Sequence, residues 1–116
     1  MIINKTSDYT ALQPSAQNDD KSKNILEFNK EFNEKYANFR NENIILDFSN
    51  NINIALEEIL LFSQKSRNHK KNNKSFIIVC TNVDIDTMTD EMIVVPTFIE
   101  AEDVIEIEEI ERDLGI

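Results

Sequence analysis

The residues that could take part in catalysis are few, and their spacing matches no familiar catalytic centre. Nucleophilic catalysis of the triad type needs a base beside the nucleophile, usually a histidine, and the sequence has one histidine, His69. It lies in a stretch rich in lysine and asparagine, so we expect it to be solvated. A zinc centre needs several His, Cys or acidic ligands at defined spacing, which His69 and the single cysteine, Cys80, cannot supply. We therefore predict no catalytic residue, no metal site and no cofactor.

Two acidic features could still bind an ion. One is a stretch that contains Asp84, Asp86, Asp90 and Glu91. It lacks the alternate spacing, central glycine and closing glutamate of an EF-hand, so we interpret it as a solvated loop, with a weak magnesium site as the alternative. The other is Asp47, which ends an apolar segment and precedes Ser49. Functional residues gather at the carboxyl ends of strands in open α/β sheets; alternatively, Asp47 accepts nearby N–H groups and Ser49 begins a turn.

The charge balance excludes some classes of partner. The 116 residues carry 22 acidic and 12 basic side chains, a formal net charge of −10, which opposes binding to nucleic acid or to an anionic membrane. The basic residues concentrate in the middle of the chain, at Lys65, Arg67, Lys70, Lys71 and Lys74. One cysteine excludes an internal disulfide, and no apolar run is long enough for a leader or a membrane span. We expect a single cytoplasmic domain of undetermined oligomeric state.

The elements that must position these residues follow from the hydrophobic pattern. Residues 20–40 place apolar side chains at three- and four-residue steps, which predicts a helix with one aromatic face: Ile25, Phe28, Phe32, Tyr36 and Phe39. A second helix is predicted over residues 54–68. Apolar runs predict strands at 43–48, 74–80 and 93–95. Either 1–4 or 9–12 could form an edge strand before a loop. We expect a small α/β domain with a mostly parallel sheet of about four strands and three to four helices.

The C-terminal segment predicts an acidic helix with two apolar faces. Thr97 and Glu100 fit the capping pattern at a helix start. At about 100° per residue, one side carries Phe98, Ala101, Val104 and Ile105, and another carries Ile107, Ile110 and Leu114. The second side is bordered by Glu106, Glu109 and Asp113, a pattern typical of helices that dock into a groove. Either the helix is straight and this side faces away from the sheet, or it ends near Glu106 and the tail, residues 107–116, folds back.

Several of these segments resemble a STAS domain, the fold of bacterial anti-sigma-factor antagonists. The similar segments are NIILDFS (43–49), SFIIVC (75–80) and VVPTFIEA (94–101), within residues 43–106. That family has a strand ending in L-D-L-S, then D-S-S-G-L at a helix start, where a partner kinase phosphorylates serine. The D-S-S-G positions fall on Ala55, Leu56, Glu57 and Glu58, so the phosphoacceptor is absent here. With Asp47 and Ser49, these residues form a candidate switch region.

The C-terminal sequence, VVPTFIEAEDVIEIEEIERDLG (94–115), is similar to the ending of small STAS-like proteins from Bacteroidetes that are often labelled ribonuclease Z. Ribonuclease Z itself is a much larger metallo-β-lactamase-fold enzyme with an H-x-H-x-D-H zinc motif, which this sequence does not contain. The resemblance thus implies association with that nuclease rather than its activity.

Together these features favour a non-catalytic regulatory module that binds a protein partner. We expect the contact to involve Ile107, Glu109, Ile110 and Leu114. Two alternatives remain open: a ribonuclease Z-associated role in tRNA 3′-end processing, and a sigma-factor-pathway regulator. In the second case Ser49 would be the only hydroxyl near the loop that a kinase could modify.

Overall fold

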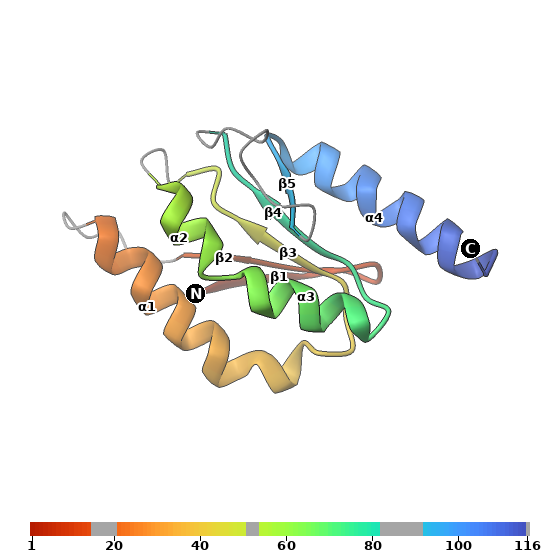
Figure 1. The fold of residues 1–116 in the computed structure, drawn as a ribbon, viewed down its shortest axis with the longest axis horizontal. Coiled ribbons are helices and arrows are strands. Elements are labelled where there is room, and N and C mark those ends of the chain that lie inside the picture. The colour runs from red at the N-terminus through yellow and green to blue at the C-terminus, as the bar shows by residue number, and fades with distance from the viewer. Residues whose placement is uncertain (15–20, 51–53, 82–91, 116) are drawn as a thin grey trace.

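The computed structural model describes residues 1–14, 21–50, 54–81 and 92–115, without the side chains of 21–24. These residues form an α/β domain around one sheet (Figure 1). The predicted fold class is confirmed, although the sheet has five strands rather than about four. The acidic stretch with Asp84, Asp86, Asp90 and Glu91 lies outside the described residues.

The sheet is parallel except at one edge. Its strands are β1 (Ile2–Lys5), β2 (Thr10–Gln13), β3 (Ile44–Asp47), β4 (Phe76–Val79) and β5 (Ile93–Val95), and they lie side by side in this order. β1 is antiparallel to β2, whereas β2, β3, β4 and β5 are parallel. Both N-terminal segments considered for an edge strand thus form strands. Of these two, only β1 is an edge strand, because β2 pairs with β1 on one side and with β3 on the other.

Helices cover both faces of the sheet (Figure 1). One face holds α1 (Lys21–Lys35), the short 3-10 helix η1 (Tyr36–Asn38), α2 (Leu56–Leu60) and α3 (Ser63–Lys71); the other holds α4 (Phe98–Asp113). Alternation along the strands divides the core accordingly. In β3, Ile44 and Leu46 face the first layer of helices, whereas Ile45 faces α4.

The aromatic face predicted for the first helix forms the centre of the larger core. Phe28 and Phe32 of α1 are buried, and Phe28 packs edge to face against Phe48, with ring centroids 5.3 Å apart. Phe62 contacts Phe28, Phe32 and Phe48. The smaller core beneath α4 contains Ala11, Ile45, Ile77, Val79, Ala101 and Ile105.

The second predicted helix, over residues 54–68, is two helices. The helix is interrupted at Leu61 and Phe62, and Phe62 has φ −95° and ψ 2°. Phe62 is buried, while Leu61 is exposed. After α3 the chain turns at Asn73, whose φ of +62° lies in the left-handed region that asparagine tolerates. The turn leads directly into β4.

Candidate functional site

The acidic C-terminal helix is continuous. The side chain of Thr97 accepts a hydrogen bond from the backbone N–H of Glu100 at 3.2 Å, so the predicted N-cap is present. The helix ends at Asp113, and Gly115, with φ +72°, donates its N–H to the carbonyl of Arg112 at 3.1 Å. A left-handed glycine just past the last turn is a common helix terminator. The alternative in which the helix ends near Glu106 and the tail folds back is therefore wrong.

The two predicted apolar sides of α4 face in opposite directions. Ala101 and Ile105 are buried against the sheet, and Phe98 and Val104 pack partly against the same core. The other side is solvent-exposed: 55% of Ile107, 51% of Ile110 and 68% of Leu114 are accessible. We call these three residues the outer stripe. Three large apolar side chains on one helical face are thus left without cover by the described residues.

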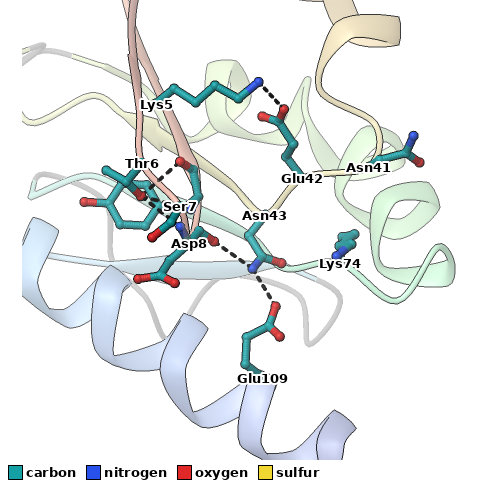
Figure 2. Close-up of a pocket in the computed structure, with 10 residues that line it drawn as sticks. Lys5, Thr6, Ser7, Asp8, Asn41, Glu42, Asn43, Lys74 and Glu109 are labelled. Atoms are coloured by element: carbon teal, nitrogen blue, oxygen red, sulfur yellow. Dashed lines mark hydrogen bonds and ion pairs between the residues drawn. The ribbon is translucent and has the colours of Figure 1, made fainter.

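Asn43 fixes the C-terminal half of α4 against the sheet. It lies directly before β3, is 5% exposed, and donates from Nδ2 to the carbonyl of Asp8 at 2.9 Å and to Glu109 Oε1 at 2.7 Å. Its Oδ1 accepts from the backbone N–H of Ser75 at 2.9 Å and from the guanidinium of Arg112 at 3.3 Å. Figure 2 shows this amide between Asp8 and Glu109. One side chain therefore connects the β1–β2 turn, the start of β3, the residue before β4, and α4.

Arg112 completes this polar network. Its guanidinium donates to Glu109 Oε1 at 2.8 Å and to the hydroxyl of Ser75 at 3.2 Å. Because α4 runs back along the sheet, its last two turns meet the amino ends of the parallel strands. Neither Asn43 nor Arg112 was among the site residues predicted from the sequence. The one available signal was a polar residue immediately before an apolar strand.

Glu109 differs from its predicted role as an open contact residue, because its Oε1 already accepts two hydrogen bonds. The bond from Asn43, followed by the bond from Arg112, holds the pKa of this carboxyl below its ordinary value. Glu109 thus anchors α4, whereas the nearby outer stripe is exposed. Whether Glu109 also contacts a partner stays a prediction.

Two hollows flank this network. The first has a volume of about 430 Å3 and lies at the amino ends of the strands, between the β1–β2 turn, residues 41–43 and Lys74 (Figure 2). Lys5 and Glu42 form an ion pair there. Its described lining has amides, hydroxyls, carboxylates and two lysines, and includes no histidine or cysteine. This composition offers polar contacts but no pairing of a nucleophile with an imidazole base.

The second hollow lies along α4. Its volume is about 510 Å3, and it is bordered by the β1–β2 turn at Asp8 and Tyr9 and by α4. Ile105 and Ile110 contribute its apolar part. We call it the acidic groove, because the other four of its α4 residues are Glu102, Glu106, Glu109 and Asp113. Ile110 belongs both to this groove and to the outer stripe, so the two surfaces are continuous.

His69 is buried, so the prediction of a solvated histidine is wrong. Its exposed fraction is 0%, and its ring packs edge to face on Phe76. Nε2 lies 2.6 Å from the carbonyl of Glu42, and Nδ1 lies 2.6 Å from the hydroxyl of Tyr36. A carbonyl only accepts, so Nε2 carries the proton and neutral His69 accepts from Tyr36 at Nδ1. Both nitrogens are satisfied, which indicates a structural role.

The candidate switch region is partly described. Asp47 Oδ1 accepts the backbone N–H of Ser49 at 2.9 Å, and both residues are half-buried. Glu58 accepts the backbone N–H of Ala55 at 2.8 Å at the start of α2. Leu56 is half-buried and Glu57 is exposed. The first contact agrees with the local-turn interpretation of Asp47, and a switch function stays a prediction.

Within the described residues, no group of three or more His, Cys, Asp or Glu side chains could hold a metal ion. No helix in the described ranges has the length and apolar content needed to cross a membrane.

Comparison with known proteins gives no assignment for this α/β domain. No family model matches the sequence, and no curated protein matches it.

Proposed function

We propose that this protein is a non-catalytic, STAS-like interaction module that acts in the cytoplasm and binds a protein partner through the outer stripe of α4. The observation that carries the proposal is the exposure of Ile107, Ile110 and Leu114 on a helix that is held in place. The STAS-like part rests on the sequence resemblance within residues 43–106.

The rigidity of α4 supports this use of the stripe. Ala101 and Ile105 fix its first half by apolar burial, and Glu109 and Arg112 fix its second half through Asn43 and Ser75. A helix backbone that is already fixed loses little conformational freedom when a partner covers its exposed side chains. Helical ridges of this kind bind apolar grooves through side chains spaced three, four or seven residues apart, as Ile107, Ile110 and Leu114 are.

A capture experiment with the full chain tests the proposal. The triple variant Ile107→Ser, Ile110→Ser, Leu114→Ser removes the outer stripe but leaves the Asn43 network intact. We expect the unaltered chain to recover a partner protein from a lysate of the source cells, and the triple variant to lose it. Substitution is preferable to truncation at Glu106, because truncation would also remove Glu109 and Arg112.

The matched control is Ile3→Ser, Leu26→Ser, Leu61→Ser, which removes three exposed apolar side chains away from α4. We expect this control to recover the partner as the unaltered chain does. Equal recovery by the stripe variant would refute the proposed contact.

A further inference from the structure

The charge of this protein is concentrated on the helix that carries the outer stripe. α4 contains eight acidic residues and one basic residue, Arg112, which gives a formal charge of −7 of the −10 for the whole chain. Arg112 is itself bound to Glu109. On the opposite face of the sheet, α3 contains Lys65, Arg67, Lys70 and Lys71 and no acidic residue. The exposed apolar stripe therefore lies in the most negative part of the described surface.

Three carboxylates at the acidic groove are available to a second molecule. The side chains of Asp8, Glu106 and Asp113 are exposed, and none of them makes a hydrogen bond or ion pair with another described residue. Glu102 and Glu109, by contrast, accept from Tyr9 and Asn43. The groove thus combines free negative charge at its rim with the apolar side chains of Ile105 and Ile110.

Tyr9 borders the acidic groove beside two carboxylates, those of Asp8 and Glu102. Tyr9 donates to Glu102 Oε2 at 2.9 Å and packs edge to face on Phe98. Burial, then the hydrogen bond and charge of Glu102, then the charge of Asp8 raise its pKa to about 12. Burial disfavours any charge here, whereas the carboxylates of Glu102 and Asp8 disfavour only a second negative charge and attract a cation.

We propose that the partner docks with a basic amphipathic segment, whose apolar side chains cover Ile107, Ile110 and Leu114 and whose lysine or arginine enters the acidic groove. The aliphatic stem of that residue lies along Tyr9 and Ile110, and its charged end reaches Glu106 and Asp113. Long basic side chains commonly divide their contacts in this way. This inference rests on the proposed function and specifies the chemistry of the partner.

The charge distribution argues against the other occupants. If a second copy docked helix to helix, two α4 helices, each of formal charge −7, would meet, and like charges in contact are unfavourable. Nucleic acid and anionic membranes would be repelled for the same reason. A basic protein segment is the occupant whose charge complements the stripe and the groove together.

A peptide titration tests the proposed chemistry. Two 18-residue helical peptides with the same leucine face are added to the 15N-labelled full chain, one with lysine and one with glutamate at the bordering positions. We expect the lysine peptide to bind and to shift the amide signals of Tyr9, Ile110 and Asp113, with affinity that falls steeply as NaCl is raised. The glutamate peptide should not bind. Shifts confined to residues outside α4 and the β1–β2 turn, or equal binding of both peptides, would overturn the inference.

Charge variants locate the contact. Glu106→Gln with Asp113→Asn should weaken binding of the lysine peptide roughly tenfold, because two carboxylates near the bound cation are removed. The control, Glu34→Gln with Glu57→Gln, removes two exposed carboxylates away from α4 and should change the affinity less than about twofold. Equal effects of the two pairs would show attraction to net charge alone and would overturn the groove assignment.

The two proposals can fail separately. If a captured partner depends on Ile107, Ile110 and Leu114 but resists both high salt and the Glu106→Gln, Asp113→Asn change, the interaction module stands and the basic-segment inference fails. If no partner depends on the outer stripe, both fail. A stripe-dependent homodimer in sedimentation would likewise overturn the basic-segment inference, since the occupant would be a second copy.

Discussion

Asn43 shows how a single amide can join elements that are distant in sequence. Its four hydrogen bonds reach Asp8, Ser75, Glu109 and Arg112, at separations of 35, 32, 66 and 69 residues. The bond from the backbone of Ser75 is fully buried. Since an unsatisfied buried polar group costs more than a hydrogen bond gains, the side chain should matter for stability beyond its size.

The first prediction concerns this residue. Asn43→Ala should lower the free energy of unfolding by roughly 2–3 kcal/mol, because it leaves the buried N–H of Ser75 unpaired and releases Glu109. Urea titration followed by circular dichroism measures the change. The control is Asn41→Ala, at an exposed position two residues away, which should stay within about 0.5 kcal/mol of the unaltered chain. A loss at Asn43 as small as the loss at Asn41 would contradict the role described.

The second prediction concerns His69. Burial is the main cause that lowers its pKa from the ordinary 6.5; Lys74 adds to the lowering, and the bond to the Glu42 carbonyl opposes it. His69 therefore binds a proton more readily in the unfolded chain than in the folded one. The contribution of His69 to stability is complete above about pH 6.5 and is lost as the pH falls through the lowered folded-state pKa.

Since the chain has one histidine, its imidazole proton signal can be followed by NMR without assignment. We expect a midpoint below 6.5, and a smaller loss of stability between pH 7.5 and 5 in His69→Gln. Glu31 and Glu109 do not confound this range, since bonds from Lys35 and Asn43, respectively, lower their pKa values further below 4.5. A midpoint at or above 6.5 would rule out the buried neutral imidazole.

At the scale of elements, α4 separates residues that stabilise the fold from residues that are available for binding. The third prediction follows from this division. Ile105→Ala should lower the free energy of unfolding by about 2–4 kcal/mol, because Ile105 is 2% exposed. Ile110→Ala, five residues on, should change it by less than about 0.5 kcal/mol. Thermal or urea unfolding compares the two, and a large loss at Ile110 would mean that the outer stripe belongs to the core.

Elements were predictable from sequence where the pattern was local. The strand Ile93–Val95, the Thr97 cap and the two sides of α4 each depend on residues within a few positions of one another, and the structure confirms them. His69 was misjudged because its hydrogen-bond partners, Tyr36 and the Glu42 carbonyl, lie 33 and 27 residues away. Lysine-rich surroundings indicated the exposure of its neighbours and gave no information on the direction of the histidine ring.

The same limit applies to the candidate site. The outer stripe was visible in the helical periodicity, but the acidic groove was not, because part of its border, Asp8 and Tyr9, comes from the β1–β2 turn. Periodicity also could not indicate that Glu109 accepts a hydrogen bond from Asn43, since this hydrogen bond forms only when the last turns of α4 reach the amino end of β3.

At the scale of the whole molecule, the sheet predicts a gradient of local stability. β3 and β4 are paired on both edges and covered on both faces, whereas β1 has exposed residues and, among the described strands, a partner on one side only. The fourth prediction is that amide hydrogen exchange is slowest in Ile44–Asp47 and Phe76–Val79 and fastest among the strands in Ile2–Lys5. Exchange in β1 as slow as in β3 would indicate that another chain covers this edge.

Because α3 and α4 lie on opposite faces of the sheet, their charges affect how the protein rotates as it approaches a charged partner. A helix of formal charge −7 on one side and a basic helix on the other give the molecule a permanent electric dipole across the sheet. Near a cationic body such a dipole experiences a torque that turns α4 towards it while the two are still separated by about a Debye length. The molecule then no longer tumbles isotropically, and a larger share of collisions begins with Ile107, Ile110 and Leu114 facing the cationic body.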